Sequence, residues 1–178
     1  MIINTSKLRK NYTIEDMSYL DSSEASVLYK KQADIVRSNQ CKYLVDVGCR
    51  TGEINRYLKN YNYFYYGFDT SEEPISYAQK KYPQHRFEVR DWNDLCFTST
   101  DVVIFGSVLI YNKDPISMFE RICEFYKAKR AIVHEVNTNN TEDLPYTNLD
   151  YFNQYKNTRY EFNLNIPVGH RTIIDVEL

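Results

Sequence analysis

Residues 46–52 read DVGCRTG, directly after a short apolar run and directly before a stretch with helical periodicity. A glycine-bearing turn between a buried strand and a helix brings backbone N–H groups close to a ligand. In an open parallel sheet, such a turn lies at the carboxyl end of a strand, where ligands bind. The carboxylate of Asp46 would repel a phosphate, whereas it can accept a hydrogen bond from a cationic amine. This loop therefore predicts a ligand site, and its charge argues against a pyrophosphate.

Short apolar runs alternate with amphipathic stretches on both sides of this loop, from Cys41 to Glu135. The alternation is typical of strands and crossover helices around a parallel sheet. We predict strands at residues 43–47, 63–68, 87–89, 102–105 and 131–135. We predict helices at residues 53–59, 72–82 and 115–125, with Ser71 and Asp114 as N-caps. Five β/α units result.

The two ends of the chain have different patterns. Residues 12–39 mix polar and apolar side chains at helical spacing, which predicts one or two helices leading into the core. Residues 159–166 and 172–178 alternate and are joined by a segment with Pro167 and Gly169, which predicts a β-hairpin. No internal repeat or flexible linker interrupts the sequence, so we expect one domain.

Size and composition narrow the class of protein. A chain of 178 residues with 43% hydrophobic and 26% charged residues is that of an ordinary globular domain. The formal net charge of -2 gives no overall attraction to nucleic acid or to an anionic membrane. No stretch approaches about 18 uninterrupted apolar residues, and the first residues lack a signal-peptide pattern. The four cysteines lie far apart with no metal-ligand spacing, so we expect reduced thiols in the cytoplasm and no metal site.

The glycine spacing distinguishes two classes of nucleotide-binding protein. A dinucleotide-binding enzyme would carry GxGxxG, whereas this loop has only Gly48 and Gly52. The loop instead resembles the first motif of class I S-adenosylmethionine-dependent methyltransferases, an acidic residue followed by three alternating glycines. Asp46, Gly48 and Gly52 match that motif, and Arg50 stands at the place of its middle glycine. A nicotinamide-dependent oxidoreductase on a similar sheet remains an alternative hypothesis.

The later β/α units carry further residues of the predicted cofactor site. Asp69 ends the second strand roughly twenty positions after the first glycine, the separation expected for a carboxylate that binds ribose hydroxyls. The resemblance implies that Asp91 accepts from the adenine amino group and that Trp92 covers the adenine ring. It also implies that the Arg50 guanidinium meets the methionine carboxylate. The full predicted cofactor-binding set is Asp46, Gly48, Cys49, Arg50, Gly52, Asp69, Thr70, Asp91, Trp92, Gly106 and Ser107.

No motif defines the catalytic residues. Methyl transfer from a sulfonium centre is an in-line displacement of an activated group, so alignment and desolvation can supply most of the catalysis. Tyr111, His134 and Glu135 lie close to the expected active face and are the candidates for a general base. His134 is the candidate whose ordinary pKa lies near neutrality.

These observations predict a three-layer α/β protein with a Rossmann-like methyltransferase fold, whose seven-stranded, mainly parallel sheet ends in an antiparallel C-terminal hairpin. We expect one domain over residues 1–178: N-terminal helices in 1–40, cofactor-binding β/α units in 41–135, and a substrate-side segment with the hairpin in 136–178.

The predicted activity is methyl transfer from S-adenosylmethionine, with S-adenosylhomocysteine as the product, to a small molecule or a small exposed group of a larger partner. Residues 105–108 lack the Asn/Asp-Pro-Pro-aromatic motif, which counts against methylation of nucleic-acid bases. The alternative is an inactive S-adenosylmethionine-binding module that regulates a partner. Its motivation is Arg50 in place of glycine together with the absence of an obvious base.

Overall fold

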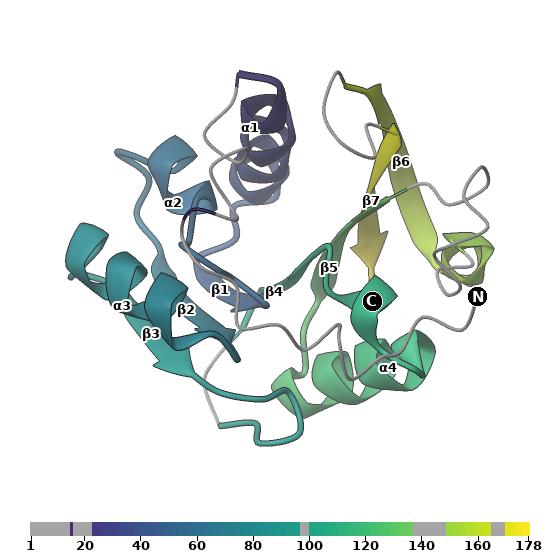
Figure 1. The fold of residues 1–178 in the computed structure, drawn as a ribbon. Coiled ribbons are helices and arrows are strands. Elements are labelled where there is room, and N and C mark those ends of the chain that lie inside the picture. Colours follow the sequence, from purple (N-terminus) through teal and green to yellow (C-terminus); the bar gives the residue numbers. More distant parts are fainter. Residues whose placement is uncertain (1–14, 16–22, 97–99, 137–148, 165–169) are drawn as a thin grey trace.

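The computed structural model describes residues 15, 23–96, 100–136, 149–164 and 170–178. Seven strands form one sheet (Figure 1): β1 (Tyr43–Val47), β2 (Phe64–Asp69), β3 (Arg86–Val89), β4 (Val102–Gly106), β5 (Arg130–Val136), β6 (Lys156–Asn163) and β7 (His170–Glu177). Their order is β3-β2-β1-β4-β5-β7-β6. The first five strands are parallel, and β7 is antiparallel to both of its neighbours. The predicted fold class is therefore confirmed.

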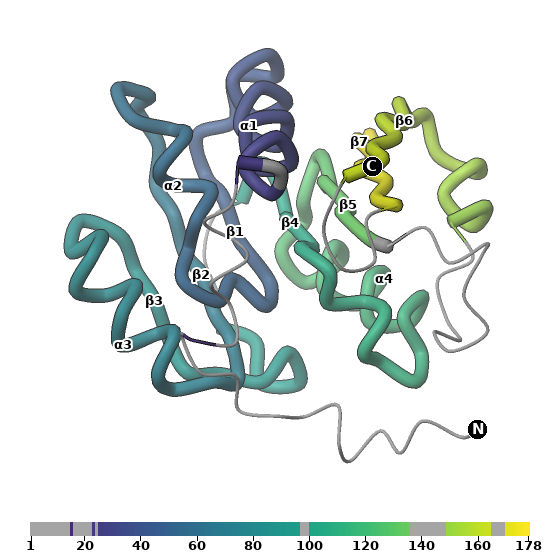
Figure 2. Tube along the Cα trace, turned by 45° about the horizontal axis from the view of Figure 1, so that its top comes forward, coloured from purple at the N-terminus to yellow at the C-terminus, as the bar shows by residue number. Residues whose placement is uncertain are grey.

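Helices cover both faces of this sheet (Figures 1 and 2). The first face carries α1 (Ser23–Ser38), α2 (Ile54–Tyr57) and α3 (Glu72–Lys81), and the second carries α4 (Pro115–Tyr126) and the 3-10 helix η5 (Leu149–Gln154). Successive strand residues alternate between the two cores, so that Leu44 packs in the first and Val45 in the second. Because the parallel strands are buried on both faces, they read as continuous apolar runs in the sequence.

The order of the strands determines where a ligand can bind. β1 pairs with β2 on one side and with β4 on the other, so the direction of winding reverses between β1 and β4. Ligands of open α/β sheets bind at such a reversal, beyond the carboxyl ends of the strands. The loop at residues 48–52 and the turn after β4 therefore share one end of the molecule.

The element boundaries agree with the sequence prediction to within one residue for the five parallel strands, whereas the helix predicted at 53–59 contracts to α2 (Ile54–Tyr57). The Asp114 side chain accepts from the Ser117 amide at 3.0 Å, which confirms this N-cap. Ser71 occupies the N-cap position of α3 without a side-chain cap, because its buried hydroxyl has no hydrogen-bond partner among the described residues. The Ser71 prediction was therefore correct for the position and wrong for the bond.

The predicted N-terminal helices and C-terminal hairpin are partly covered by the described residues. α1 fulfils part of the helical prediction for residues 12–39, whose first part falls outside the described residues except for Glu15. β6 and β7 form the predicted antiparallel pair, and the segment with Pro167 and Gly169 is likewise outside the described residues. Within the described part of the chain, no helix is long and apolar enough to cross a membrane.

Candidate active site

The loop after β1 has three residues with left-handed backbone, Gly48 (φ 66°), Arg50 (φ 50°) and Gly52 (φ 68°). A Cβ on Gly48 would lie 2.9 Å from the Val108 side chain, and a Cβ on Gly52 would lie 2.7 Å from the ring of Phe87. We expected these glycines because a ligand needs close approach. The structure corrects this reason, since backbone handedness and packing against neighbouring protein side chains already require glycine at both positions.

Arg50 adopts the conformation that glycine favours, so the loop keeps its shape without the middle glycine. Its backbone N–H donates to Asp69 Oδ2 at 3.1 Å, which ties the loop to the end of β2. A non-glycine residue in this region costs about 1–2 kcal/mol relative to the right-handed one. A cost of this size, kept at one position of a cofactor loop, favours a role for the guanidinium.

Replacing Arg50 with glycine tests this role. We expect the Arg50→Gly variant to keep its free energy of unfolding within about 1 kcal/mol, because relief of the left-handed strain offsets the greater entropy of the unfolded chain. We expect its Kd for S-adenosylmethionine to rise about tenfold or more, because a charged hydrogen-bond partner of the carboxylate is lost. Thermal unfolding and calorimetric titration measure the two effects. Arg50→Lys keeps a positive charge as the control, and an unchanged Kd in Arg50→Gly would remove the assignment.

Asp69 connects the first two β/α units. Its Oδ2 accepts from the Arg50 amide at 3.1 Å, and its Oδ1 accepts from the Ser71 amide at 2.9 Å. The side chain is half-buried, and each carboxylate oxygen has a second lone-pair direction. Asp69 therefore has the acceptor capacity for a diol at the carboxyl end of β2. Thr70, next to it, is exposed.

Asp46 is a buried carboxyl one residue before the end of β1. Tyr65 Oη donates to its Oδ2 at 2.7 Å. Burial is the main cause that raises the pKa of Asp46 to about 7; the Tyr65 hydrogen bond and Arg50 oppose the rise, and Asp69 adds to it. A cationic amine beside this carboxyl would stabilise its charged form, which fits the amine of the predicted cofactor.

A small cavity lies between α1 and the carboxyl ends of β1, β4 and β5. The wall contains seven of the predicted site residues: Asp46, Gly48, Cys49, Arg50, Gly106, Ser107 and His134. Its volume is about 30 Å³, and Ala25, Leu28 and Tyr29 of α1 contribute to its wall.

Gly106 differs from the loop glycines. A Cβ built on it would meet no atom within 4 Å among the described residues, and the residue lines the cavity. Cys49 contributes backbone to the same wall, while its sulfur packs 2.7 Å from the place of a Cβ on Gly67. The open space beside Gly106 belongs to the cavity that Asp46 and Arg50 also line.

The residues after β3 lie apart from this cavity. Asp91 Oδ1 accepts from the backbone and side-chain nitrogens of Asn93, at 2.9 and 2.8 Å. Trp92 packs partly buried against the second core, with the Arg121 guanidinium carbon 5.6 Å from its ring centroid. Asp91 and Trp92 therefore remain a prediction for the adenine end.

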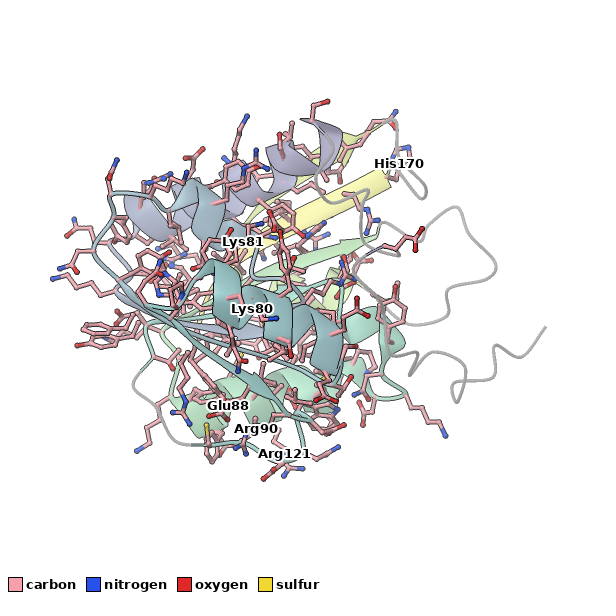
Figure 3. The ribbon with its side chains drawn as sticks, turned by 60° about the vertical axis from the view of Figure 1, so that its left-hand side comes forward. Lys80, Lys81, Glu88, Arg90, Arg121 and His170 are labelled. Carbon is pink, nitrogen blue, oxygen red and sulfur yellow. The ribbon has the colours of Figure 1, made fainter. Side chains whose placement is uncertain are left out.

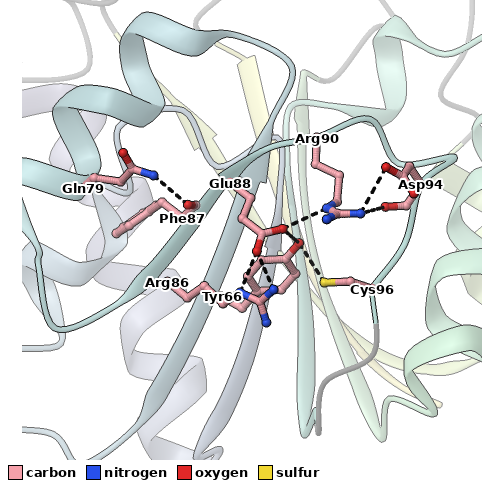
Figure 4. Close-up of polar contacts among 8 residues, drawn as sticks. All are labelled: Tyr66, Gln79, Arg86, Phe87, Glu88, Arg90, Asp94 and Cys96. Atoms are coloured by element: carbon pink, nitrogen blue, oxygen red, sulfur yellow. Dashed lines mark hydrogen bonds and ion pairs between the residues drawn. The ribbon is translucent and has the colours of Figure 1, made fainter.

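The loop after β3 is held by a network of ion pairs (Figures 3 and 4). Glu88 accepts from Arg90 Nε at 2.9 Å, and Arg90 Nη1 donates to the Asp94 backbone oxygen at 2.7 Å. Tyr66 Oη also donates to Glu88, at 3.1 Å. These contacts fix the loop that carries the predicted adenine-binding residues.

A larger hollow of about 620 Å³ opens on the opposite side of α2, toward the amino ends of β2 and β3. It is lined by residues of the α2–β2 and α3–β3 connections and includes no member of the predicted site. The smaller cavity is the candidate site, because ligands of this sheet topology bind at the carboxyl ends of the strands. Among the described residues, no group of three or more His, Cys, Asp and Glu side chains could hold a metal ion.

Of the three base candidates, His134 alone lines the cavity. Its Nδ1 is 3.1 Å from Gln32 Nε2, and its buried Nε2 has no hydrogen-bond partner among the described residues. Burial, together with the charges of Arg171 and Arg50, lowers its pKa to about 3. We had expected a pKa near neutrality, so the basis for a general-base role is corrected: protonation of this imidazole is strongly disfavoured.

Glu135 and Tyr111 lie outside the cavity wall. Glu135 is fully buried and its Oε1 accepts from the Leu109 amide at 2.9 Å, which positions the turn after β4. Tyr111 is half-buried in the 3-10 helix η3 (Leu109–Tyr111). Both belong to the support of the turn rather than to the surface that a ligand would touch.

Glu135 predicts a pH dependence of stability. Burial raises its pKa from the ordinary 4.5 to about 8, so the folded state binds a proton that the unfolded state releases between these values. This contribution is complete below pH 4.5 and is lost as the pH rises toward about 8. We expect the Tm of Glu135→Gln, measured against wild type, to improve steadily from pH 5 to pH 8. The exposed Glu161→Gln is the control, and Tm curves of wild type and Glu135→Gln that stay parallel would contradict the prediction.

Two side chains of the cavity were missed in the sequence. Gln32 lies one helical turn after Leu28 and Tyr29 on the face of α1 that covers the site. Arg171 comes from β7, and only the pairing of β7 with β5 brings it beside the ends of β4 and β5. Helical spacing offered a weak signal for Gln32, whereas no local pattern identifies Arg171.

A family model described as "Methyltransferase domain" matches residues 45–147, more than half of the chain. No curated protein sequence matches significantly.

Solved structures share the fold. N-methyltransferase NodS from Bradyrhizobium japonicum WM9, in complex with S-adenosyl-L-homocysteine, has a TM-score of 0.78 at 11% identity, with 98% of each chain covered. Magnesium protoporphyrin IX methyltransferase (ChlM) from Synechocystis PCC 6803, with bound S-adenosylmethionine, has a TM-score of 0.72 at 17% identity, with 97% of this chain and 96% of that chain covered. On the matched family model, the chain belongs to the methyltransferase domain family and is an S-adenosylmethionine-dependent methyltransferase of the class I, Rossmann-like type.

Proposed function

We propose that the cavity under α1 binds the methionine part of S-adenosylmethionine and that the enzyme methylates a small molecule or a small exposed group of a larger partner. The observation that carries the proposal is the open space beside Gly106, which is bordered by Asp46 and Arg50. A carboxyl and a guanidinium that line one cavity match the amine and the carboxylate of an amino acid. A pyrophosphate is an anion and would offer no cationic group to the carboxyl of Asp46.

The remaining predicted residues complete this site in the proposal. Asp69 holds the ribose hydroxyls with the lone pairs left over from its two backbone hydrogen bonds. Asp91 and Trp92 hold the adenine. The backbone N–H groups of Gly48, Cys49, Arg50 and Gly52 already donate to Phe68, Asp69 and Cys49, so the loop contributes its shape and side chains rather than these donors. Thr70 and Ser107 lie beside Asp69 and Gly106 and belong to the same set.

In this proposal, the chain contributes alignment and exclusion of water rather than proton transfer. The sulfonium of S-adenosylmethionine supplies an activated methyl group, so no base is required for the displacement itself. α1 contributes Ala25, Leu28 and Tyr29 to the cavity wall, which keeps water from the reacting atoms when the site is filled. Gln32 and Ser107 fix the side chains that face the acceptor.

Calorimetric titration with S-adenosylmethionine and S-adenosylhomocysteine tests the cofactor site. We expect micromolar Kd values for both, and no binding of NADH. Methyl transfer from labelled S-adenosylmethionine to any acceptor separates the enzyme from an inactive binding module. Absence of binding to either nucleoside would contradict the proposed site.

The cytoplasm is the proposed compartment. The described cysteines, Cys41, Cys49, Cys96 and Cys123, are all free thiols, as the wide spacing in the sequence predicted. Localisation of a tagged full chain by microscopy or fractionation tests this part of the proposal.

A further inference from the structure

Four buried polar side chains from elements other than the glycine loop line the same cavity. They are Gln32 of α1, Ser107 after β4, His134 of β5 and Arg171 of β7. Their exposed fractions are 2%, 6%, 7% and 9%. Arg171 Nη1 donates to Ser107 Oγ at 3.2 Å, and the Gln32 amide contacts the His134 ring at 3.1 Å. Polar groups this deeply buried are costly unless they have partners.

His134 has hydrogen-bonding capacity that the protein leaves unused. With the Gln32 amide nitrogen at Nδ1, that ring nitrogen is the acceptor, and the ring proton is therefore on Nε2. His134 Nε2 is buried without a partner among the described residues. A buried N–H without an acceptor costs about 1–3 kcal/mol, which a ligand oxygen would recover.

The charge around this ring favours an anion. Burial, Arg171 and Arg50 together lower the pKa of His134, so the imidazole is neutral and stands in the field of two guanidinium groups. The neighbouring Glu135 has a raised pKa and is fully buried, which leaves its carboxyl mainly protonated at neutral pH. An anionic group with two oxygen acceptors suits Arg171 and His134 better than a cation or a neutral amine does.

We propose that His134 and Arg171 hold the carboxylate of an organic-acid acceptor and that the enzyme forms a methyl ester, an inference that rests on the proposed function of the same cavity. A lone pair of the carboxylate oxygen forms the new O–CH3 bond. The sulfonium S–CH3 bond breaks, its electron pair stays on sulfur, and the products are the ester and the neutral thioether. No proton is released, so the reaction needs no base.

The need for a base distinguishes carboxylates from other acceptors. A hydroxyl must lose a proton on methylation, and an alkylamine must enter unprotonated and release one afterwards. Two carboxyl groups also line the cavity: Asp46 faces the cofactor amine in the proposed function, and Glu53 pairs with Lys81 Nζ at 2.6 Å. His134 would then have to accept that proton beside Arg171 and Arg50, which opposes its charged form. A carboxylate is already deprotonated at neutral pH, so the site supports this acceptor without change.

Acetate and its uncharged isostere acetamide test the carboxylate site directly. We titrate each into the 15N-labelled full chain, with and without S-adenosylhomocysteine, and follow the imidazole nitrogens of the three histidines. We expect acetate to shift the 15N resonance of His134 Nε2 saturably and to leave the resonances of His85 and His170 unchanged. We expect acetamide to bind with at most a tenth of the affinity of acetate. The missing signal in His134→Gln assigns the resonance. Equal effects of acetate and acetamide, or no effect on His134, would overturn the inference.

Variants separate this site from the cofactor site. Arg171→Met should weaken acetate binding at least tenfold and leave the Kd for S-adenosylhomocysteine within about threefold. Lys156→Met, which removes an exposed cation of the same hairpin, should change neither constant. Loss of S-adenosylhomocysteine binding in Arg171→Met would place the guanidinium on the cofactor and overturn the inference. Failure of wild type to bind S-adenosylhomocysteine contradicts the proposed function instead, while the acetate titration without nucleoside still tests the carboxylate site.

The chemical outcome gives a second test. With 13C-methyl-labelled S-adenosylmethionine, a mixture of straight-chain and aromatic carboxylic acids is compared with amines of the same carbon skeletons. Label that enters the acids and is released as methanol by base supports the inference. Label that enters the amines and not the acids overturns it.

Discussion

The Gly106→Val variant should lose binding of S-adenosylmethionine and S-adenosylhomocysteine by at least about a hundredfold in Kd while it keeps its fold. Gly106 ends β4, and a Cβ at this position meets nothing within 4 Å among the described residues. Valine suits a strand position, so the substitution adds no backbone strain. Its methyl groups instead enter the cavity beside Asp46 and Arg50, where the cofactor would have to lie. Calorimetry measures the Kd, and thermal unfolding measures stability.

Two glycine variants serve as controls for Gly106→Val. Gly106→Ala adds only the Cβ and should weaken cofactor binding much less than valine does. Gly67→Ala differs from Gly106→Ala in stability, because its Cβ would lie 2.7 Å from Cys49 Sγ and 2.8 Å from the Tyr65 ring, within the core. It should lower Tm, since overpacking a core costs about 1–3 kcal/mol. If Gly106→Val binds the cofactor normally, the open space beside Gly106 is not the cofactor site.

The sequence was sufficient to predict the fold because each β/α unit carries its own local signal. The five parallel strands are apolar on both faces, and the helices between them have amphipathic spacing and, at Asp114, a working N-cap. The hairpin was recognised from its alternation. β7 is inserted between β5 and β6, an order that depends on pairing between distant segments and that was not predicted from the sequence.

The cofactor loop was found for a reason that proved incomplete. Gly48 and Gly52 were expected to make room for a ligand, whereas packing against Val108 and Phe87 already excludes a side chain at both positions. The sequence shows the glycines but not which side chains pack against them in space, so it cannot separate the two causes. Gly106, which received less weight, is the glycine whose missing side chain leaves open space.

The catalytic prediction was limited by burial, which a sequence does not show. His134 was chosen for a pKa near neutrality, but desolvation and two arginines lower that pKa to about 3. One of these arginines, Arg171, lies 37 positions further along the chain and reaches the cavity only through the β5–β7 pairing. The residue type alone therefore did not predict how weakly basic this imidazole is in its buried, positively charged surroundings.

The Asp69→Ala variant should weaken the binding of S-adenosylhomocysteine by about 1–3 kcal/mol, or roughly tenfold to a hundredfold in Kd. The carboxylate is expected to accept from the ribose hydroxyls. It also accepts from the amides of Arg50 and Ser71, which hold the loop after β1 and the start of α3 in place. Loss of these two bonds should additionally lower the free energy of unfolding by about 1–3 kcal/mol. Calorimetry and denaturant unfolding of the same preparation measure both quantities.

The control for Asp69→Ala must lose the same kind of bond away from the cofactor. Asp101 provides it, because its Oδ2 accepts from the amides of Lys42 and Tyr43, at 2.8 and 3.1 Å, at the amino end of the sheet. Asp101→Ala should therefore lower stability by a similar amount and leave the Kd for S-adenosylhomocysteine unchanged. If Asp69→Ala and Asp101→Ala lose affinity equally, the effect of Asp69 is one of stability alone. A loss confined to Asp69→Ala means that the carboxylate that ties the two loops together also binds the cofactor.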